Sequence, residues 1–114
     1  MAEKKGYVAT SKFLIASPTK VRPVAHVINQ KSYTEAMAIL ANMPQKGATL
    51  ISATLKSAAA NALNQNSKLD EDMLYVKEIR VDEGPRLKRV WFSARGRADQ
   101  LLKRMCHITV IVDE

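Results

Sequence analysis

Three groups of residues could carry out chemistry if the fold brought the right partners to them. Ser17-Pro18-Thr19-Lys20 has the Ser-x-x-Lys spacing of acylating serine enzymes. The carboxylate triplet Asp70-Glu71-Asp72 could serve acid–base chemistry or hold a cation. Two histidines, His26 and His107, and one cysteine, Cys106, are residue types that bind transition metals.

None of these groups has the companions that its chemistry requires. The other motifs of the Ser-x-x-Lys enzymes are missing and the chain is too short for their fold, so Ser17 is predicted to cap a helix. No glycine-bearing calcium loop surrounds the carboxylates, which are expected in a solvated turn. The sequence holds no H-x-x-x-H, C-x-x-C, G-x-G-x-x-G or P-loop spacing. We therefore predict no catalytic residue, metal, cofactor or small-molecule substrate.

The lysines and arginines do point to a function. They number 18 against 11 acidic residues, so the net charge is +7. This excess favours a polyanionic partner, either a nucleic acid or an anionic membrane surface, with acidic proteins a weaker third choice. Residues 86–104 alone carry +6, and we expect this stretch, which contains Trp91 and Phe92, to be an arm that contacts a polyanion. Its charged residues are Arg86, Lys88, Arg89, Arg95, Arg97, Lys103 and Arg104, against Asp99.

Length and composition limit the alternatives. A chain of 114 residues with 46% apolar residues fits one domain with a single core. The lone cysteine cannot form an internal disulfide, and no secretory signal pattern opens the chain, which favours a reducing, cytoplasmic compartment. No apolar stretch approaches the roughly 18 to 20 residues that a membrane-spanning helix needs.

The first half of the chain predicts one strand and three helices. Residues 7–15 are rich in strand formers, and a helix follows over 18–29, with Ser17 as its cap and Pro23 costing it one internal hydrogen bond. The capping box Ser32-Tyr33-Thr34-Glu35 begins a second helix, which ends near Asn42. Pro44 is expected to open a third helix of about five turns. Its apolar stripe consists of Ala48, Ile51, Leu55, Ala58, Ala59 and Ala62.

The second half predicts strands at 74–81 and 106–112. In the last strand Cys106, Ile108, Val110 and Val112 share one face, which is expected to join the core. If Leu74 pairs with Val112, the ladder turns near Ser93, and arms of about ten residues extend about 30 Å beyond the core. An isolated basic ribbon of that length is marginal in water, so we infer an α+β globule with a protruding hairpin that settles against nucleic acid.

Several strings, in order and in register, carry a family resemblance. They are Ser17-Pro18-Thr19-Lys20-Val21-Arg22, Leu55-Lys56-Ser57-Ala58-Ala59-Ala60-Asn61-Ala62, Val81-Asp82-Glu83-Gly84-Pro85, Leu87-Lys88-Arg89, Ala94-Arg95-Gly96-Arg97-Ala98-Asp99, and Lys103-Arg104 with His107-Ile108-Thr109-Val110. From about residue 7 onward the chain resembles the bacterial form of large-subunit ribosomal protein twenty-two.

This resemblance implies a fold and a function. The fold is α+β, with three helices packed on a small three-stranded antiparallel sheet and a long protruding β-hairpin. Residues 1–114 would form one domain, with a globular part at 1–82 and 105–114 and the hairpin at 83–104. Such a protein is a non-enzymatic ribosomal constituent that binds large-subunit ribosomal RNA and supports subunit assembly. Its hairpin tip lines the nascent-peptide exit tunnel, beside ribosomal protein four and the nascent peptide.

The resemblance also implies site residues. The RNA-binding set is Lys12, Lys20, Arg22, Lys56, Arg86, Lys88, Arg89, Arg95, Gly96, Arg97, Lys103, Arg104 and His107. The tunnel-lining tip is Lys88, Arg89, Val90, Trp91, Phe92, Ser93 and Ala94. This chain has Phe92-Ser93 where the family usually has Pro-Arg, so one tip cation and one backbone restraint are missing.

Two questions stay open from the sequence. Trp91 and Phe92 either stack on bases or face the tunnel lumen, or else pack across the hairpin. The alternative function is a free nucleic-acid-binding or RNA-chaperone module, because charge alone does not distinguish it from a ribosomal constituent.

Overall fold

The computed structural model describes residues 6–92, 94–96 and 98–114. Its elements follow the predicted order of one strand, three helices and then further strands. The first half comprises β1 (Tyr7–Leu14), α1 (Pro18–Ile28), α2 (Tyr33–Ala41) and α3 (Lys46–Gln65). The second half comprises a 3-10 turn (Glu71–Met73), β2 (Tyr75–Glu83), β3 (Leu87–Phe92), a second 3-10 turn (Ala94–Gly96), β4 (Ala98–Lys103) and β5 (Cys106–Asp113).

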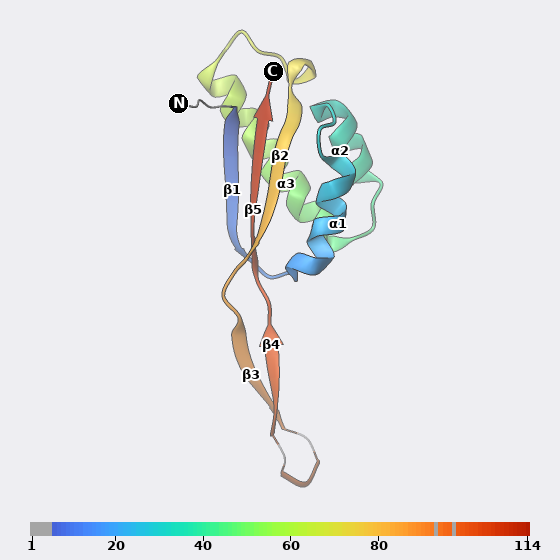
Figure 1. Ribbon diagram of the computed structural model, residues 1–114, viewed down its shortest axis with the longest axis vertical. Helices are drawn as coiled ribbons and strands as arrows, with labels where there is room; N and C mark the ends of the chain where they lie inside the picture. Colours follow the sequence, from blue (N-terminus) through green and yellow to red (C-terminus); the bar gives the residue numbers. More distant parts are fainter. Residues whose placement is uncertain (1–5, 93, 97) are drawn as a thin grey trace.

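Two antiparallel sheets lie end to end along the molecule. The first has the order β1-β5-β2, and the second consists of β3 and β4 alone. Helix α3 packs on β1 and β5 and α1 on β2, so all three helices lie on one side of the first sheet, and the β3–β4 hairpin projects away from it (Figure 1). The molecule measures 65 × 34 × 20 Å. The predicted α+β class, with three helices, a three-stranded antiparallel sheet and a protruding hairpin, is confirmed.

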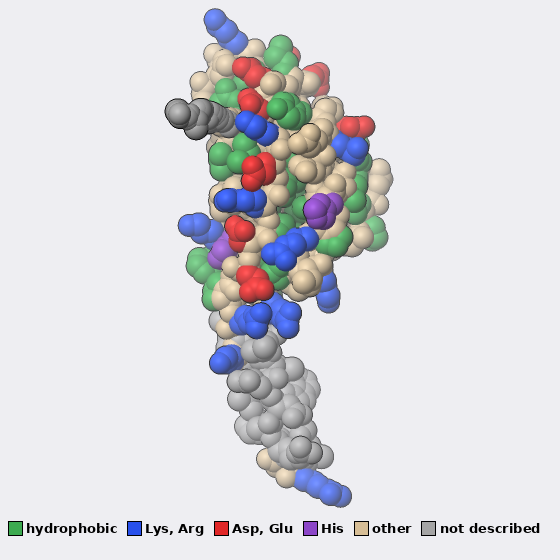
Figure 2. Space-filling view, viewed as in Figure 1, with side chains coloured by type: hydrophobic (Ala, Val, Ile, Leu, Met, Phe, Trp, Pro, Cys, Tyr) green, Lys and Arg blue, Asp and Glu red, His purple; other side chains and the backbone are tan. Residues whose placement is uncertain are grey.

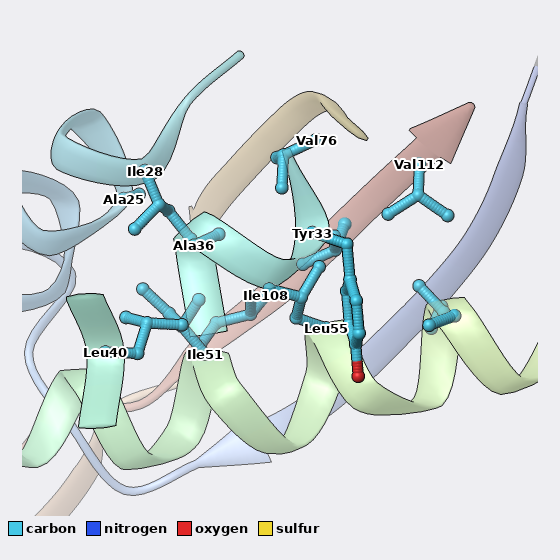
Figure 3. Packing of buried hydrophobic residues seen from close by; sticks show 14 of the residues in the cluster. Ala25, Ile28, Tyr33, Ala36, Leu40, Ile51, Leu55, Val76, Ile108 and Val112 are labelled. Carbon is cyan, nitrogen blue, oxygen red and sulfur yellow. The ribbon is translucent and has the colours of Figure 1, made fainter. Parts of the chain in front are cut away.

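The core is built on the inner face of β5. Cys106, Ile108, Val110 and Val112 are all fully buried there, as the alternating pattern predicted. The stripe of α3 faces them, and Figure 3 shows Leu55 and Ile108 approaching each other from the helix and the strand. The alternation of the last strand and the three-and-four spacing of α3 therefore described two surfaces of the same core.

Polar contacts fix the helices on the sheet. The hydroxyls of Ser11 on β1 and Thr54 on α3 are 2.7 Å apart, and the Asn61 side chain donates to the Val8 carbonyl at 3.0 Å. Thr54 is only 1% exposed and also donates to the Leu50 carbonyl, so its buried hydroxyl is satisfied. These bonds hold β1 against α3 at two levels.

The helix starts agree with the sequence only in part. The Ser32 hydroxyl accepts a hydrogen bond from the Glu35 N–H at 3.3 Å, which confirms that half of the capping box. Ser17 occupies the N-cap position of α1, but its hydroxyl bonds the Thr19 hydroxyl at 2.9 Å and caps no backbone amide, so its predicted capping bond is wrong. Helix α3 begins at Lys46, two residues after Pro44, because Gln45 is the extended cap residue.

The predicted strand register is wrong by two residues. Val112 pairs with Val76 rather than with Leu74. A β-bulge between Val76 and Glu78 shifts the register again, and the hairpin turns at Ala94–Gly96 rather than at Ser93. The error arose because uninterrupted pairing was assumed, whereas each bulge inserts an extra residue on one strand.

No helix in the described part of the chain is long and apolar enough to span a membrane.

Truncating the buried stripe of α3 tests the core assignment. We expect Leu55→Ala to lower the free energy of unfolding by about 2–5 kcal/mol, because Leu55 is fully buried and its loss leaves a cavity. Val27→Ala on α1 is the control, since Val27 is 43% exposed and should change stability by less than about 1 kcal/mol. Urea unfolding followed by circular dichroism measures both. Equal losses in the two variants would contradict the assignment.

The single thiol offers a second test. Cys106 is fully buried, and burial raises the pKa of its thiol, so less reactive thiolate is present at pH 8 than an exposed cysteine would have. We expect a thiol reagent such as dithionitrobenzoate to react with the protein only in denaturant. Because Cys106 is the only cysteine in the chain, the absorbance of the released thiolate reports this residue alone. Rapid reaction of the native protein would place β5 outside the core.

Candidate nucleic-acid interface

The sheet and the hairpin are joined by a narrow region that we call the neck, formed by residues 15–20, 83–86 and 103–105. Its two crossing segments are tightly paired. Glu83 pairs with Cys106, and the Gly84 N–H donates to the Met105 carbonyl at 2.8 Å, one step beyond the end of β2. A Cβ on Gly84 would lie 3.3 Å from the Met105 carbonyl carbon, which is tight even for packed side chains. Glycine at 84 therefore lets the two segments pass at close range.

Two hollows on the neck share the same residues. One has a volume of 380 Å³ and is lined by Lys20, Arg104 and the turn from Ile15 to Thr19. A smaller cleft is lined by Thr19, Glu83, Arg86 and Arg104, among others. Because Thr19 and Arg104 border both, the structure brings Lys20, Arg86 and Arg104 together, although they are up to 84 positions apart in the sequence.

The cations of the neck outnumber its carboxylates. Arg86 reaches Glu83 at 3.7 Å, but both side chains are largely exposed, so this ion pair is weak in water. In the described part of the face shown in Figure 2, Lys and Arg side chains gather at the neck, whereas basic and acidic side chains alternate over the sheet. The neck is thus a positive surface on an otherwise nearly balanced globule.

The hairpin continues this surface away from the core. Its strands pair from Leu87 with Lys103 to Phe92 with Ala98. The tip turns through left-handed conformations at Arg95, with φ 65°, and Gly96, with φ 72°, and nothing lies within 4 Å of the position that a Gly96 Cβ would occupy. The side chains of Lys88, Arg95 and Lys103 are exposed. Phosphates could therefore approach from the neck to the tip.

Four members of the predicted RNA-binding set lie outside the neck and the hairpin. Lys12 and Lys56 are exposed on β1 and α3. Arg22 donates from Nε and Nη2 to the Val81 carbonyl, at 3.2 and 3.0 Å, so it ties α1 to β2. His107 accepts a hydrogen bond at Nδ1 from the Phe13 N–H at 3.0 Å. The structure thus gives two of the four an internal role in addition to the predicted contact.

Some predicted residues cannot be placed. Ser93 and Arg97 lie outside the described residues. Five predicted site residues have a described backbone, but their side chains are not described: Arg89, Val90, Trp91, Phe92 and Ala94. The choice between base stacking and cross-strand packing for Trp91 and Phe92 therefore stays a prediction.

Two residues of this region were missed from the sequence. Thr19 borders both hollows, and Lys46 donates from Nζ to the Ile15 carbonyl at 2.8 Å, which fixes the turn that lines the larger one. The only sequence signal was the proximity of Thr19 to Lys20. Nothing in the local pattern around Lys46 indicated a contact with residue 15.

The groups that could do chemistry stay apart. Glu71 and Asp72 lie exposed in the 3-10 turn, far from Ser17 in sequence and on a different element. Among the described residues, no three His, Cys, Asp or Glu side chains are placed to hold a metal ion. What the arrangement can do is bind anions through exposed guanidinium and ammonium groups.

Comparisons with known proteins agree with this geometry. Residues 9–113 match the family described as "Ribosomal protein L22p/L17e". The chain is 74% identical, over its whole length and 97% of the relative's, to the large ribosomal subunit protein uL22 of Treponema denticola. It is 59% identical to the protein of the same name from Treponema pallidum and 52% identical to that from Borreliella afzelii, covering 92% and 95% of them.

These matches define the class as structural ribosomal proteins, which are not enzymes. Within that class, the chain belongs to the bacterial ribosomal protein uL22 family.

Salt dependence tests the positive surface. If about seven cations meet phosphates, the affinity for large-subunit ribosomal RNA should fall with salt with a logarithmic slope of about −5 to −6. Replacing Arg86, Lys88, Lys103 and Arg104 by Gln should make that slope less steep by about 3. Filter binding from 50 to 300 mM KCl measures it.

The matched control removes the same charge elsewhere. Gln replaces Lys31, Lys68, Lys77 and Arg80, which lie outside the neck and the hairpin, and the slope should change by less than about 1. Equal changes in the two variants would show that charge acts through its total and not through its location.

Proposed function

We propose that this chain is built into the large ribosomal subunit by binding ribosomal RNA along one continuous surface, from the neck to the hairpin tip. The observation that carries the proposal is the location of the charge. Residues 86–104 hold +6 of the net +7, and they form the neck and a hairpin that projects beyond the core. A projecting basic ribbon gains little from its own core, whereas surrounding phosphates would neutralise its self-repulsion.

In this proposal the chain is one domain with two parts. Residues 1–82 and 105–114 form the globular part, and residues 83–104 form the arm that threads between RNA segments. Lys20, Arg86 and Arg104 of the neck hold phosphates at the base of the arm, and Lys88, Lys103 and Arg95 continue the contacts toward the tip. Specificity comes mainly from RNA shape, because phosphate contacts position a protein without reading sequence.

The proposed place of the tip is the wall of the nascent-peptide exit tunnel. Support comes from membership of the uL22 family and from the length of 65 Å, which lets the tip lie far from the globular part. The neighbours proposed there are ribosomal protein four and the nascent peptide. By joining distant RNA segments, the arm would also support subunit assembly.

Sedimentation tests incorporation. We expect the full-length tagged chain, expressed in a bacterium, to sediment with large subunits through a sucrose cushion containing 0.5 M ammonium chloride. A free RNA-binding module or RNA chaperone would wash off under the same conditions, because salt displaces contacts that are only electrostatic. The variant with Gln at positions 86, 88, 103 and 104 should be depleted from the subunits, and the variant with Gln at 31, 68, 77 and 80 should be retained.

Crosslinking then tests the tunnel placement. A photoreactive amino acid at Arg95, at the tip, should crosslink to stalled nascent chains, whereas the same group at Lys68, in the turn after α3, should not. Crosslinks from position 68 but not from position 95 would reverse the proposed orientation.

A further inference from the structure

Phe13 is an exposed aromatic residue held in an unfavourable backbone conformation. Its side chain is 57% exposed at the end of β1, and its φ is 59°, in the left-handed region that bulky residues avoid. The irregularity lies in the bulge between Ser11 and Leu14, where β1 leaves its register with β5. Strain that places a large apolar ring in water stabilises no core. Such strain persists where the surroundings impose it, and it is concentrated at functional sites.

His107 imposes the conformation. The Phe13 N–H donates to His107 Nδ1 at 3.0 Å, and the two rings meet edge to face, with centroids 5.0 Å apart and planes at 86°. A perpendicular contact uses at most one face of the Phe13 ring. With more than half of the side chain exposed, the other face is open to a flat partner.

The surroundings of the ring are positive. Lys12 precedes it on β1 and is exposed. Ile15, two residues further on and 56% exposed, lines the hollow of the neck together with Lys20 and Arg104. The acidic residues nearest in register, Asp82 and Glu83, lie on β2, which is separated from β1 by β5. An open aromatic face between cations suits a nucleobase and its two phosphates better than an acidic or neutral protein surface.

We infer that Phe13 is a stacking platform for one unpaired base of large-subunit ribosomal RNA, with Lys12 and the neck cations holding the adjoining phosphates. His107 is the positioning residue of this platform. The inference rests on the proposed binding of ribosomal RNA and adds to it a contact that depends on an aromatic face rather than on charge.

The test compares variants of the full-length chain binding purified large-subunit ribosomal RNA at one salt concentration. Phe13→Ala should weaken binding about 5- to 150-fold, the range found for loss of one stacked base. Phe13→Tyr should bind within about 3-fold of the unchanged chain, because it keeps the ring. Val8→Ala is the control, since it removes another exposed apolar side chain of β1, 47% exposed, and should not change binding.

Two further readouts separate stacking from folding and from charge. Phe13→Gly should bind as weakly as Phe13→Ala without a lower Tm, because glycine accepts a positive φ. The salt slope of Phe13→Ala should equal that of the unchanged chain, because no cation is lost. Ultraviolet crosslinking at 254 nm followed by mass spectrometry should find a nucleotide attached to Phe13.

The possible outcomes distinguish the two proposals. If the unchanged chain fails to bind the RNA, the proposed function fails. If it binds and Phe13→Ala binds equally well, the stacking platform is overturned and the proposed function stands. In intact subunits, a crosslink from position 13 to a protein and not to RNA would also overturn the platform, in favour of a protein neighbour.

Discussion

Strand β5 is the element on which the position of every other part depends. It pairs with β1 on one side and with β2 on the other, and its four alternate side chains are fully buried against the helices. Hydrophobic burial on one face and two ladders of backbone hydrogen bonds therefore act on the same eight residues. Because β5 follows the hairpin directly and β2 precedes it, the direction of the arm is set by this strand pair. The hairpin is a continuation of the core ladder.

The same strand pair organises the polar surface. The crossing at Gly84 and Met105 brings Arg86 and Arg104 beside Lys20, at the start of α1. Arg22 reaches across to the Val81 carbonyl and ties α1 to the end of β2, which keeps Lys20 at the neck. Cations from three segments thus meet without a buried ion pair between them. Exposed cations keep their hydration when free and can exchange it for phosphate oxygens.

Side chains near the neck also show how a small fold supports a binding surface. The bulge that breaks the β1–β5 register turns Phe13 outward, and His107 on β5 holds it there. Lys46 secures the following turn through the Ile15 carbonyl. The rigid sheet and α3 therefore stabilise an irregular segment whose own conformation is unfavourable. This division of roles is common where function needs exposed, precisely oriented groups on a stable scaffold.

Much of the element order followed from local patterns, because each pattern involved residues close in the chain. The alternation of Cys106, Ile108, Val110 and Val112 identified a buried face, and the Ser32 capping box identified the start of α2. Errors arose where a second segment decides the outcome. The bulge after Val76 moved the register, and Ser17 bonded Thr19 instead of capping α1. Neither local sequence contains the information that selects between these alternatives.

For the candidate site, the sequence by itself determined the charge of the arm, since +6 within residues 86–104 is a property of composition. It also determined the family, through motifs that run the length of the chain. Only the tertiary structure decided which cations share a surface, which of them have internal partners, and where an aromatic ring stays exposed. The physical reason is that charge and periodicity are carried by the residues themselves. A shared surface depends instead on the long-range pairing of β1, β2 and β5, which brings distant segments to one place.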